Sequence, residues 1–388
     1  MHLDALVKRL AHVQRAFKSH FRASPDLRVL VPGCVDLLGA HTLHHDGLLL
    51  AAAIDKNVLL AVRPRADKKV ILHFLNEGTS LQFSLYRLSQ KRRGTWGRHA
   101  RGIGWLLRTR GYIVRGLEGV IHSTIPIDHP TFWPALQVGL LWAWNTLDEL
   151  EIPKEALPGM CTDADKVFVK NGGPRMPCLV AVAGRQGHAM MLDCREDRYT
   201  YHPWPAHVRA VICEANARPA STRALCVKRR QEAAIALSLL RVGAPRLNTW
   251  HDVDVDLLER HRDLLNHTLF ARAYHQATEM ARVREAARAL DEGDVDALGR
   301  VFDASFRSQK DAYDVISEEL ETLWTLVHDA GAYGARLLEE CYGGNLIALV
   351  PTHELPRFQR YVVRKYRQLT GREAGIRPIH LVDGVMVL

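Results

Sequence analysis

The stretch Pro32–Thr42 reads P-G-C-V-D-L-L-G-A-H-T and directly follows a short apolar run, Leu27–Val31. The apolar run is typical of a buried strand, and the Pro-Gly pair predicts that this strand ends there. Two more apolar runs follow, Leu48–Ile54 and Val58–Val62, and each predicts another strand. We therefore expect the N-terminal part of the chain to contain a β-sheet that is interrupted at Pro32-Gly33.

The composition is that of a globular protein. The 388 residues are 47% hydrophobic and 24% charged, which excludes a disordered, collagen-like or coiled-coil chain. At about 150 residues per domain, we expect two domains. The formal net charge is +9, but the basic residues are scattered and mostly arginine, so we expect no nucleic-acid partner.

The cysteines and the hydropathy pattern both bear on where in the cell the protein is expected. Seven cysteines form no C-x-x-C pair, which favours a reducing cytoplasm over a disulfide framework or a zinc ribbon. No apolar run is long enough to span a membrane, so we expect no membrane association. Residues 3–21 are amphipathic and basic, but their apolar positions recur every three or four residues, so we expect the first helix of the fold rather than a transit peptide.

Strand and helix patterns are mixed irregularly along the rest of the chain. Helices are expected near residues 96–109, 135–147, 229–240, 257–264, 271–290, 295–308, 317–329 and 355–369. Strands are expected at 70–74, 81–85, 119–123, 178–183, 188–194, 208–213, 346–350 and 379–382. Gly184–Gly187 predicts a hairpin turn between 178–183 and 188–194, and Gly293 before Asp294 predicts a helix stop and a new N-cap. Without regular βαβ alternation, two α+β sandwiches are favoured over a doubly wound sheet.

Several stretches resemble one known family. Pro32–Thr42 resembles the galactokinase signature P-G-R-V-N-L-I-G-E-H-T-D-Y-N, and Gly184–Arg195 resembles the hairpin G-R-E-G-H-A-L-L-I-D-C-R. Ser305–Val315 resembles S-H-x-S-L-R-D-x-Y-E-V. Further similarities follow in the family's order at 46–55, 278–300, 334–350 and 383–384. The chain is thus identified as a member of the galactokinase branch of the GHMP kinases.

This resemblance implies a fold and a domain division. It implies an α+β, two-domain GHMP kinase fold with a central cleft. Residues 1–200 would form the N-terminal domain that carries the galactokinase signature, and residues 201–388 would form the C-terminal domain.

The ATP-binding loop departs from the family pattern. Galactokinases carry P-x-G-A-G-L-S-S-S-A, whose glycines let backbone N–H groups cradle phosphates and whose serine helps to hold magnesium. The matching stretch, Pro126–Ala135, reads P-I-D-H-P-T-F-W-P-A and has neither glycine nor serine. Two prolines lack N–H donors, Asp128 would repel a triphosphate, and Thr131 is the remaining hydroxyl. We expect Phe132 and Trp133 to occupy space there, and one hypothesis is that Trp133 plugs the phosphate pocket.

A second glycine-rich motif has also changed. The family's G-A-G-F-G-G is matched by residues 339–344, which begin with Glu339-Glu340 and keep Gly343 and Gly344. The positions that the resemblance assigns to the nucleotide loops are therefore Asp128, Thr131, Trp133, Gly343 and Gly344.

The catalytic positions are also replaced. Pro177 matches the family's aspartate base, and proline has no titratable group. Cys34 matches the family arginine that balances charge near the phosphoryl group, and a free thiol is mostly uncharged at neutral pH. Phosphoryl transfer depends on positioning and charge stabilisation, so we expect no catalytic residue in the family positions and no metal site.

The sugar contacts have become mostly apolar. Positions that the resemblance assigns to the substrate pocket are Ala40, His41, Leu43, Asp46, Pro174 and Leu225. Among the contacts compared, only His41, with Thr42 beside it, keeps the family residue. A site built to hydrogen-bond a sugar loses affinity when its polar groups are replaced.

Cysteines and histidines gather near these positions and leave another function open. The residues are Cys34, Cys178, Cys341, His41, His44, His45 and His129. A soft-metal site or a thiolate nucleophile would need such residues close together, but their spacing matches no known ligand pattern. The alternative is that the former ligands simply drifted to small or neutral residues.

Taken together, these features predict a galactokinase-like protein that has lost sugar phosphorylation and has a binding or regulatory role in the cytoplasm, with no cofactor. One alternative is an ATP-dependent kinase of a sugar or other small molecule with an unusual active site, which would use Mg-ATP. Another is unrelated Cys/His chemistry in the old cleft. The partner is expected to be a protein or a small molecule of unknown identity.

Overall fold

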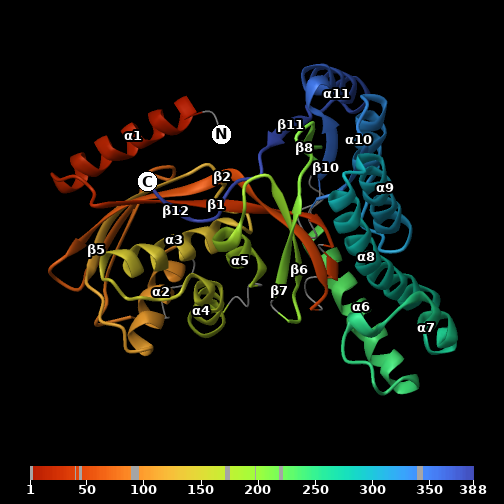
Figure 1. Ribbon diagram of the computed structural model, residues 1–388, viewed down its shortest axis with the longest axis horizontal. Helices are drawn as coiled ribbons and strands as arrows, with labels where there is room; N and C mark the ends of the chain where they lie inside the picture. The colour runs from red at the N-terminus through yellow and green to blue at the C-terminus, as the bar shows by residue number, and fades with distance from the viewer. Residues whose placement is uncertain are drawn as a thin grey trace. The chain divides into compact units, whose positions relative to one another are not determined.

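The computed structural model describes residues 3–39, 41–42, 46–88, 96–170, 175–196, 198–217, 222–338 and 344–388 (Figure 1). The chain forms two compact units, each made of separate segments. Unit 1 consists of Met1–Cys34, Ala53–Gln186 and Leu381–Leu388, and unit 2 of Val35–Ala52 and Gly187–His380. The division into domains 1–200 and 201–388 stays a prediction.

Unit 1 is built on a mixed sheet with helices on both faces (Figure 1). Its strands are β3 (Lys69–Phe74), β4 (Thr79–Ser84), β5 (Gly116–Ser123), β12 (Met386–Val387) and the parts of β1 (Leu27–Leu38) up to Cys34 and of β2 (Leu48–Arg65) from Ala53, in the order β12-β1-β2-β5-β3-β4. Its helices are α1 (Leu3–Phe21), α2 (Gly97–Thr109), α3 (Phe132–Leu147), α4 (Leu157–Ala164) and α5 (Met176–Ala183). The predicted N-terminal helix over residues 3–21 is confirmed.

The side-chain alternation of β2 explains the two covered faces. Leu59 and Ala61 point to one face and pack with Val13 and Phe17 of α1. Leu60, next along the strand, points to the other face and packs with the core formed by α2, α3, α4 and α5. Because successive residues of a strand point to opposite faces, an unbroken apolar run is what a strand covered on both sides requires.

The predicted strand break at Pro32-Gly33 is wrong, because β1 runs on to Leu38. On the outer edge of β1, the short strand β12 pairs only with Val29 and Leu30. Beyond Leu30, a proline therefore breaks no hydrogen bond to β12. Gly33 serves close packing, since a Cβ there would lie 2.9 Å from Ile125 Cδ1.

The predicted strand at 178–183 is also wrong, because these residues form most of helix α5. A short apolar run does not distinguish a buried strand from a buried helix, and Pro177 in the first turn suits a helix start. In unit 2, the observed hairpin joins β6 (His188–Asp193) to β7 (Arg198–Pro203), and β6 also pairs with Leu48–Ala51 of β2.

Unit 2 also contains a four-stranded antiparallel sheet and a set of helices. The sheet has the order β11 (Gly375–Ile379), β8 (Val208–Glu214), β10 (Asn345–Pro351), β9 (Gly334–Leu337). The helices are α6 (Thr222–Gly243), α7 (Val255–Arg260), α8 (His267–Glu292), α9 (Val295–Asp311), α10 (Glu318–Asp329) and α11 (Leu355–Thr370). The last strand was expected at 379–382, but β11 ends at Ile379 and carries Pro378 on a sheet edge, where proline is tolerated.

The predicted stop and restart between two helices of unit 2 is confirmed. Gly293 has φ 69° and ends α8, and the Asp294 side chain accepts a hydrogen bond from the Ala297 N–H at the start of α9. This tight connection sets α8 and α9 side by side, and both contribute to the polar network described below. Within the described ranges, no helix is long and apolar enough to cross a membrane.

Candidate functional site

The loop at the phosphate-binding position leads into α3 in unit 1, and most of its donors are already used. The first turn of a helix leaves about four N–H groups without a helical partner. Here the Thr131 N–H donates to His129 Nδ1 (3.3 Å) and the Phe132 N–H donates to the His129 carbonyl (3.1 Å). Pro134 has no N–H to give. At most the Trp133 N–H is left for a ligand in this turn.

The polar side chains of the loop are engaged in the same way. Thr131 Oγ1 lies 2.9 Å from His129 Nδ1, within hydrogen-bonding distance. The His129 N–H donates to the Pro126 carbonyl (3.0 Å), which closes the turn before α3. Asp128 is exposed to solvent. The loop thus forms a self-contained turn and presents a carboxylate instead of a cradle of N–H donors.

The two aromatic residues of the loop are packed against protein. Phe132 is buried, with its ring 5.4 Å from that of Phe74. Trp133 is half-buried and stacks on His99, with ring centres 4.6 Å apart and planes 8° apart. His99 Nδ1 in turn lies 3.3 Å from a buried carboxylate oxygen of Asp165. The hypothesis that Trp133 plugs a phosphate pocket stays a prediction.

The two positions expected for catalysis are both buried in unit 1. Cys34 on β1 is 3% exposed, and Pro177 is buried in the first turn of α5. Pro177 has no titratable group. The structure gives Pro177 a plain local role, since proline is well suited to the start of a helix.

Two of the cysteines, Cys161 and Cys178, lie together in the core of unit 1. Burial raises the pKa of the Cys161 thiol well above its usual value, and a hydrogen bond with Cys178 raises it further. A thiol that stays protonated is a poor nucleophile and a poor metal ligand. Among the residues that the structure describes, no three His, Cys, Asp or Glu side chains are grouped to hold a metal ion. Cys341, His44 and His45 lie outside the described residues.

His41, in unit 2, is packed inside a polar cluster. Its side chain is 2% exposed, and its Nδ1 lies 3.2 Å from Nε2 of His275, whose Nδ1 lies 2.8 Å from Ser308 Oγ. The ring of Tyr313 lies 4.4 Å from the ring of His41 and 4.5 Å from that of His275. Burial lowers the pKa of His275 to about 3, so this imidazole is neutral near pH 7.

Thr42 fixes the turn next to His41. Its hydroxyl lies 2.8 Å from the Gly39 carbonyl and 2.7 Å from the Leu48 carbonyl, and its own carbonyl accepts from the Gly47 N–H. A Cβ on Gly47 would lie 2.5 Å from Thr42 Cβ, so this contact requires glycine. The pair His41-Thr42 matches the family motif, and the structure offers an explanation for these residues that involves no bound sugar.

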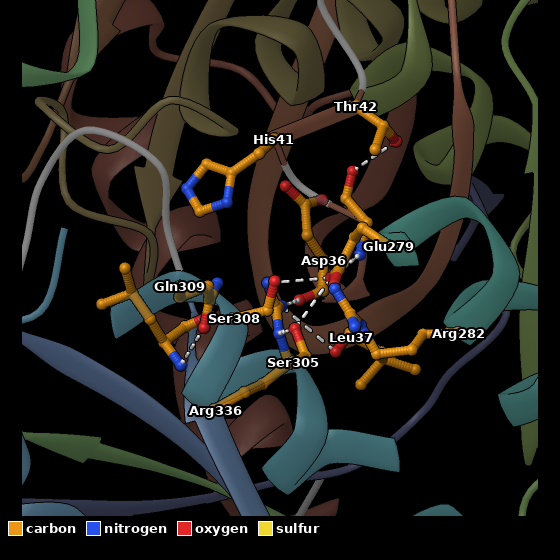
Figure 2. A network of polar contacts seen from close by, with 12 residues as sticks. Asp36, Leu37, His41, Thr42, Glu279, Arg282, Ser305, Ser308, Gln309 and Arg336 are labelled. Atoms are coloured by element: carbon orange, nitrogen blue, oxygen red, sulfur yellow. Dashed lines mark hydrogen bonds and ion pairs between the residues drawn. The ribbon is translucent and has the colours of Figure 1, made fainter. Parts of the chain in front are cut away.

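Glu279 joins the same segment of unit 2 to α8, α9 and β9 (Figure 2). Its fully buried carboxylate accepts hydrogen bonds from the Gly39 N–H (3.2 Å), Ser305 Oγ (2.8 Å) and Arg282 Nε (2.8 Å). Arg336, also fully buried, lies 3.8 Å from Glu279 and donates to the carbonyls of residues 36 and 37.

Two buried or half-buried arginines keep the central carboxylate of this network ionised. Burial alone would raise the pKa of Glu279, but the positive charges of Arg282 and Arg336 hold it well below its usual value. Sequence reasoning missed this network. One signal in the sequence could have pointed to the network, because Ser305 and Arg336 both fall in stretches that resemble the family motifs.

The remaining predicted positions are scattered over the structure. Asp46 has φ 55°, and its carbonyl lies 2.7 Å from Nε2 of His251. Leu225 is half-buried on α6. Gly344 has φ 119°, and a Cβ there would lie 2.8 Å from the Ala217 carbonyl oxygen. Ala40, Leu43, Pro174, Glu339, Glu340 and Gly343 lie outside the described residues.

Comparison of the whole fold with solved structures places it among the GHMP kinases. The mevalonate kinase of Methanococcus jannaschii aligns with a TM-score of 0.64 at 14% identity, over 93% of this chain and 100% of that chain. The Lactococcus lactis galactokinase, solved in complex with galactose, aligns with a TM-score of 0.89 at 25% identity, over 98% of this chain and 100% of that chain. The predicted α+β GHMP kinase fold is thus confirmed.

Sequence comparison identifies one family within the GHMP kinases. The galactose-binding signature of galactokinases matches residues 15–64. The galactokinase of Roseiflexus sp. (strain RS-1) is 32% identical over 375 residues, which is 96% of each chain. The human galactokinase is 30% identical over an alignment of 395 positions, which covers 98% of this chain and 96% of that one. The chain belongs to the galactokinase family.

Proposed function

We propose that this galactokinase-family protein has lost sugar phosphorylation and acts as a binding or regulatory protein. The observation that carries the proposal is the closed turn before α3, in which His129 takes the N–H groups of Thr131 and Phe132. An ATP-binding turn needs those groups to face phosphate oxygens. Without them, the γ-phosphate has neither a fixed position nor a stabilised charge, which are the main contributions to phosphoryl transfer.

The galactokinase family implies Mg-ATP as cofactor, and the residues of the loop do not suit it. The exposed carboxylate of Asp128 repels a triphosphate, and the loop offers no serine to magnesium. Thr131, its remaining hydroxyl, is already within 2.9 Å of His129 Nδ1. We therefore expect no cofactor.

The sugar positions support the same proposal. His41 keeps the family residue, but it is 2% exposed and lies between His275 and Tyr313. The role of His41 in this chain is thus packing in unit 2. The alternative of Cys/His chemistry is disfavoured because, among the described residues, no three His, Cys, Asp or Glu side chains are grouped to hold a metal ion.

One observation favours the alternative of an active small-molecule kinase that uses Mg-ATP. Relatives with 30–32% identity over nearly the full chain are galactokinases. If the loop rearranged to release its N–H groups, ATP would have a place to bind. The two functions differ in one measurable quantity, the turnover of a phosphorylation reaction.

The remaining inferences concern location and partner. We place the protein in the cytoplasm because its cysteines are odd in number and the six in the described ranges are all free thiols. The partner is a protein or a small molecule, with no role for nucleic acid or membrane.

The test is a galactokinase assay on the purified full chain. Galactose and Mg-ATP are supplied, and galactose 1-phosphate is measured beside the Lactococcus lactis galactokinase as positive control. We expect turnover at least about 10⁴-fold below the roughly 1–100 per second of typical kinases, because both the base and the phosphate-stabilising groups are missing. Other sugars and mevalonate serve as further substrates.

A matched variant sharpens the assay. Pro177→Asp supplies a carboxylate at the family's base position but leaves the closed turn in place. Because catalytic groups act as a unit, we expect this variant to stay inactive. Turnover within tenfold of the positive control, in the natural chain or in this variant, would overturn the proposal in favour of the kinase.

A further inference from the structure

Helix α11 of unit 2 has two different faces. Its apolar residues Phe358, Val362 and Tyr366 are fully buried against the four-stranded sheet and α10. The helix also carries five basic residues and no acidic residue over its 16 positions. The buried face explains how α11 is attached, but it does not explain the charge of the other face.

The outer face of α11 carries a row of arginines. Arg360, Arg364 and Arg367 are exposed and follow one another at spacings of four and three residues, so they lie on one side of the helix. With a rise of about 1.5 Å per residue, the row is about 10 Å long. Together with Pro356, Gln359, Val363 and Gln368, the three arginines line a shallow depression that is open to solvent. We call these seven residues the arginine face.

The arginine face lacks the acidic neighbours that usually balance such a row. Among the described residues, no carboxylate lies within 4 Å of any of its three guanidinium groups, whereas the neighbouring Arg357 pairs with Glu354 (3.4 Å). Some other exposed helical cations of unit 2 do have partners, such as Arg262 with Glu259 and Lys310 with Glu321. Like charges three and four residues apart destabilise a helix, so the row is kept at a cost to folding.

We propose that the arginine face docks an acidic helical segment of a partner protein. Guanidinium groups bind carboxylates in a bidentate fork, and a row about 10 Å long matches glutamates on successive turns of one helix. The half-buried Val363 provides apolar contact within the row, and the ring of Pro356 provides it one turn before Arg360. The net charge of +9 strengthens the attraction over a distance of several ångströms.

The geometry favours a protein over a membrane or a nucleic acid. An interfacial helix inserts its apolar face into lipid, but the apolar face of α11 is used inside unit 2. Three aligned guanidinium groups are fewer than the six to ten phosphate contacts that give strong nucleic-acid binding. This docking does not depend on the loss of phosphorylation, and an active kinase would carry the same surface.

The test measures binding of a defined probe to the intact chain. The probe is a fluorescein-labelled helical peptide of about 15 residues, with three glutamates spaced to oppose the row, and a second peptide has glutamines at these positions.

Two triple variants are compared, one with Arg360, Arg364 and Arg367 changed to Glu and one with Arg284, Arg288 and Arg307 changed to Glu. The second set is also exposed and helical in unit 2, so both variants have the same net charge. A triple change of the arginine face to Gln guards against misfolding by charge reversal.

We expect fluorescence anisotropy to show that the natural chain binds the glutamate peptide at least tenfold more tightly than either variant of the arginine face. The control triple variant should stay within about threefold of the natural chain, and added salt should weaken binding. Equal losses in both Glu variants, or no binding to the natural chain at 1 mM peptide, would overturn the proposal. Tighter binding of a 20-nucleotide single-stranded DNA, or of phosphatidylserine vesicles, than of the peptide would also overturn it.

Discussion

Two regions that resemble the galactokinase motifs have had different histories in this chain. The segment at residues 36–42 is held by the Glu279 network and by the packing of His41 against His275. The turn before α3 keeps its place in the fold but has closed on itself through His129. Under the proposed function, the first region keeps its contacts because folding of unit 2 depends on them, and the second was free to change once ATP was no longer bound.

The difference shows which conclusions a match to a family motif can support. A motif position that is buried in a polar network persists even when the activity is lost, since its removal leaves unpaired charges. A motif position that faces a ligand loses its constraint together with the ligand. Similarity of the first kind therefore supports common ancestry and fold, and only similarity of the second kind supports activity.

The largest effect is expected from removing the centre of the retained network. Glu279→Ala removes the carboxylate that lies 3.8 Å from the fully buried Arg336, which should cost about 3–5 kcal/mol of folding stability. Urea unfolding monitored by circular dichroism measures this loss. Glu285→Ala on the same helix is the control, because Glu285 is exposed and its loss should change stability by less than about 0.5 kcal/mol. Equal stabilities of the two variants would show that the network does not hold this segment.

The second effect is a pH dependence caused by His275. Its pKa is about 3 in the folded state, below the ordinary value of 6.5, because burial disfavours the charged ring. Above pH 6.5 both states are neutral, so His275 adds no pH dependence. As the pH falls from 6.5 towards 3, the unfolded chain binds a proton that the folded chain does not, and stability is lost. The loss over this window should reach about 2–4 kcal/mol.

This pH dependence is isolated by a variant. His275→Gln removes the titrating group and keeps a polar side chain near Ser308. We expect the variant to be less stable at pH 7 but to lose less stability between pH 6.5 and 4 than the natural chain. Parallel stability curves for the two proteins over that range would contradict the burial of a neutral His275.

The sequence was sufficient for most of the fold but for less of the site. Long amphipathic helices such as α9 were predicted within a few residues, because their apolar spacing has one interpretation. The run at 178–183 was assigned to a strand because periodicity cannot separate two buried alternatives of that length. The Glu279 network could not be predicted, because it joins Gly39 to a residue 240 positions away. The contact of His41 with its buried partner His275 could not be predicted for the same reason, since 234 positions separate the two residues.

The smallest effect concerns nucleotide binding at the region that has changed. We expect Mg-ATP to bind with millimolar affinity at best, because Asp128 repels the phosphates and the Thr131 and Phe132 N–H groups are already donated to His129. A ligand at a concentration equal to its Kd stabilises a protein by only about 0.4 kcal/mol, so a thermal shift is a poor detector and calorimetry is the better measurement.

A double variant tests whether missing donors cause the weak binding. Pro130→Gly with Pro134→Ser restores two N–H groups and one hydroxyl, and should tighten ATP binding by about tenfold. One hydrogen bond to a charged group is worth roughly 1.5–3 kcal/mol. Part of this gain is lost because glycine makes the loop more flexible. Pro245→Gly with Pro153→Ser is the control, because it makes the same chemical changes at two exposed positions outside the turn. If the natural chain already bound ATP one-to-one in the low micromolar range, the turn before α3 would have to open in solution. In that case the contrast between the two motif regions would fail, and the kinase would become the better description of this protein.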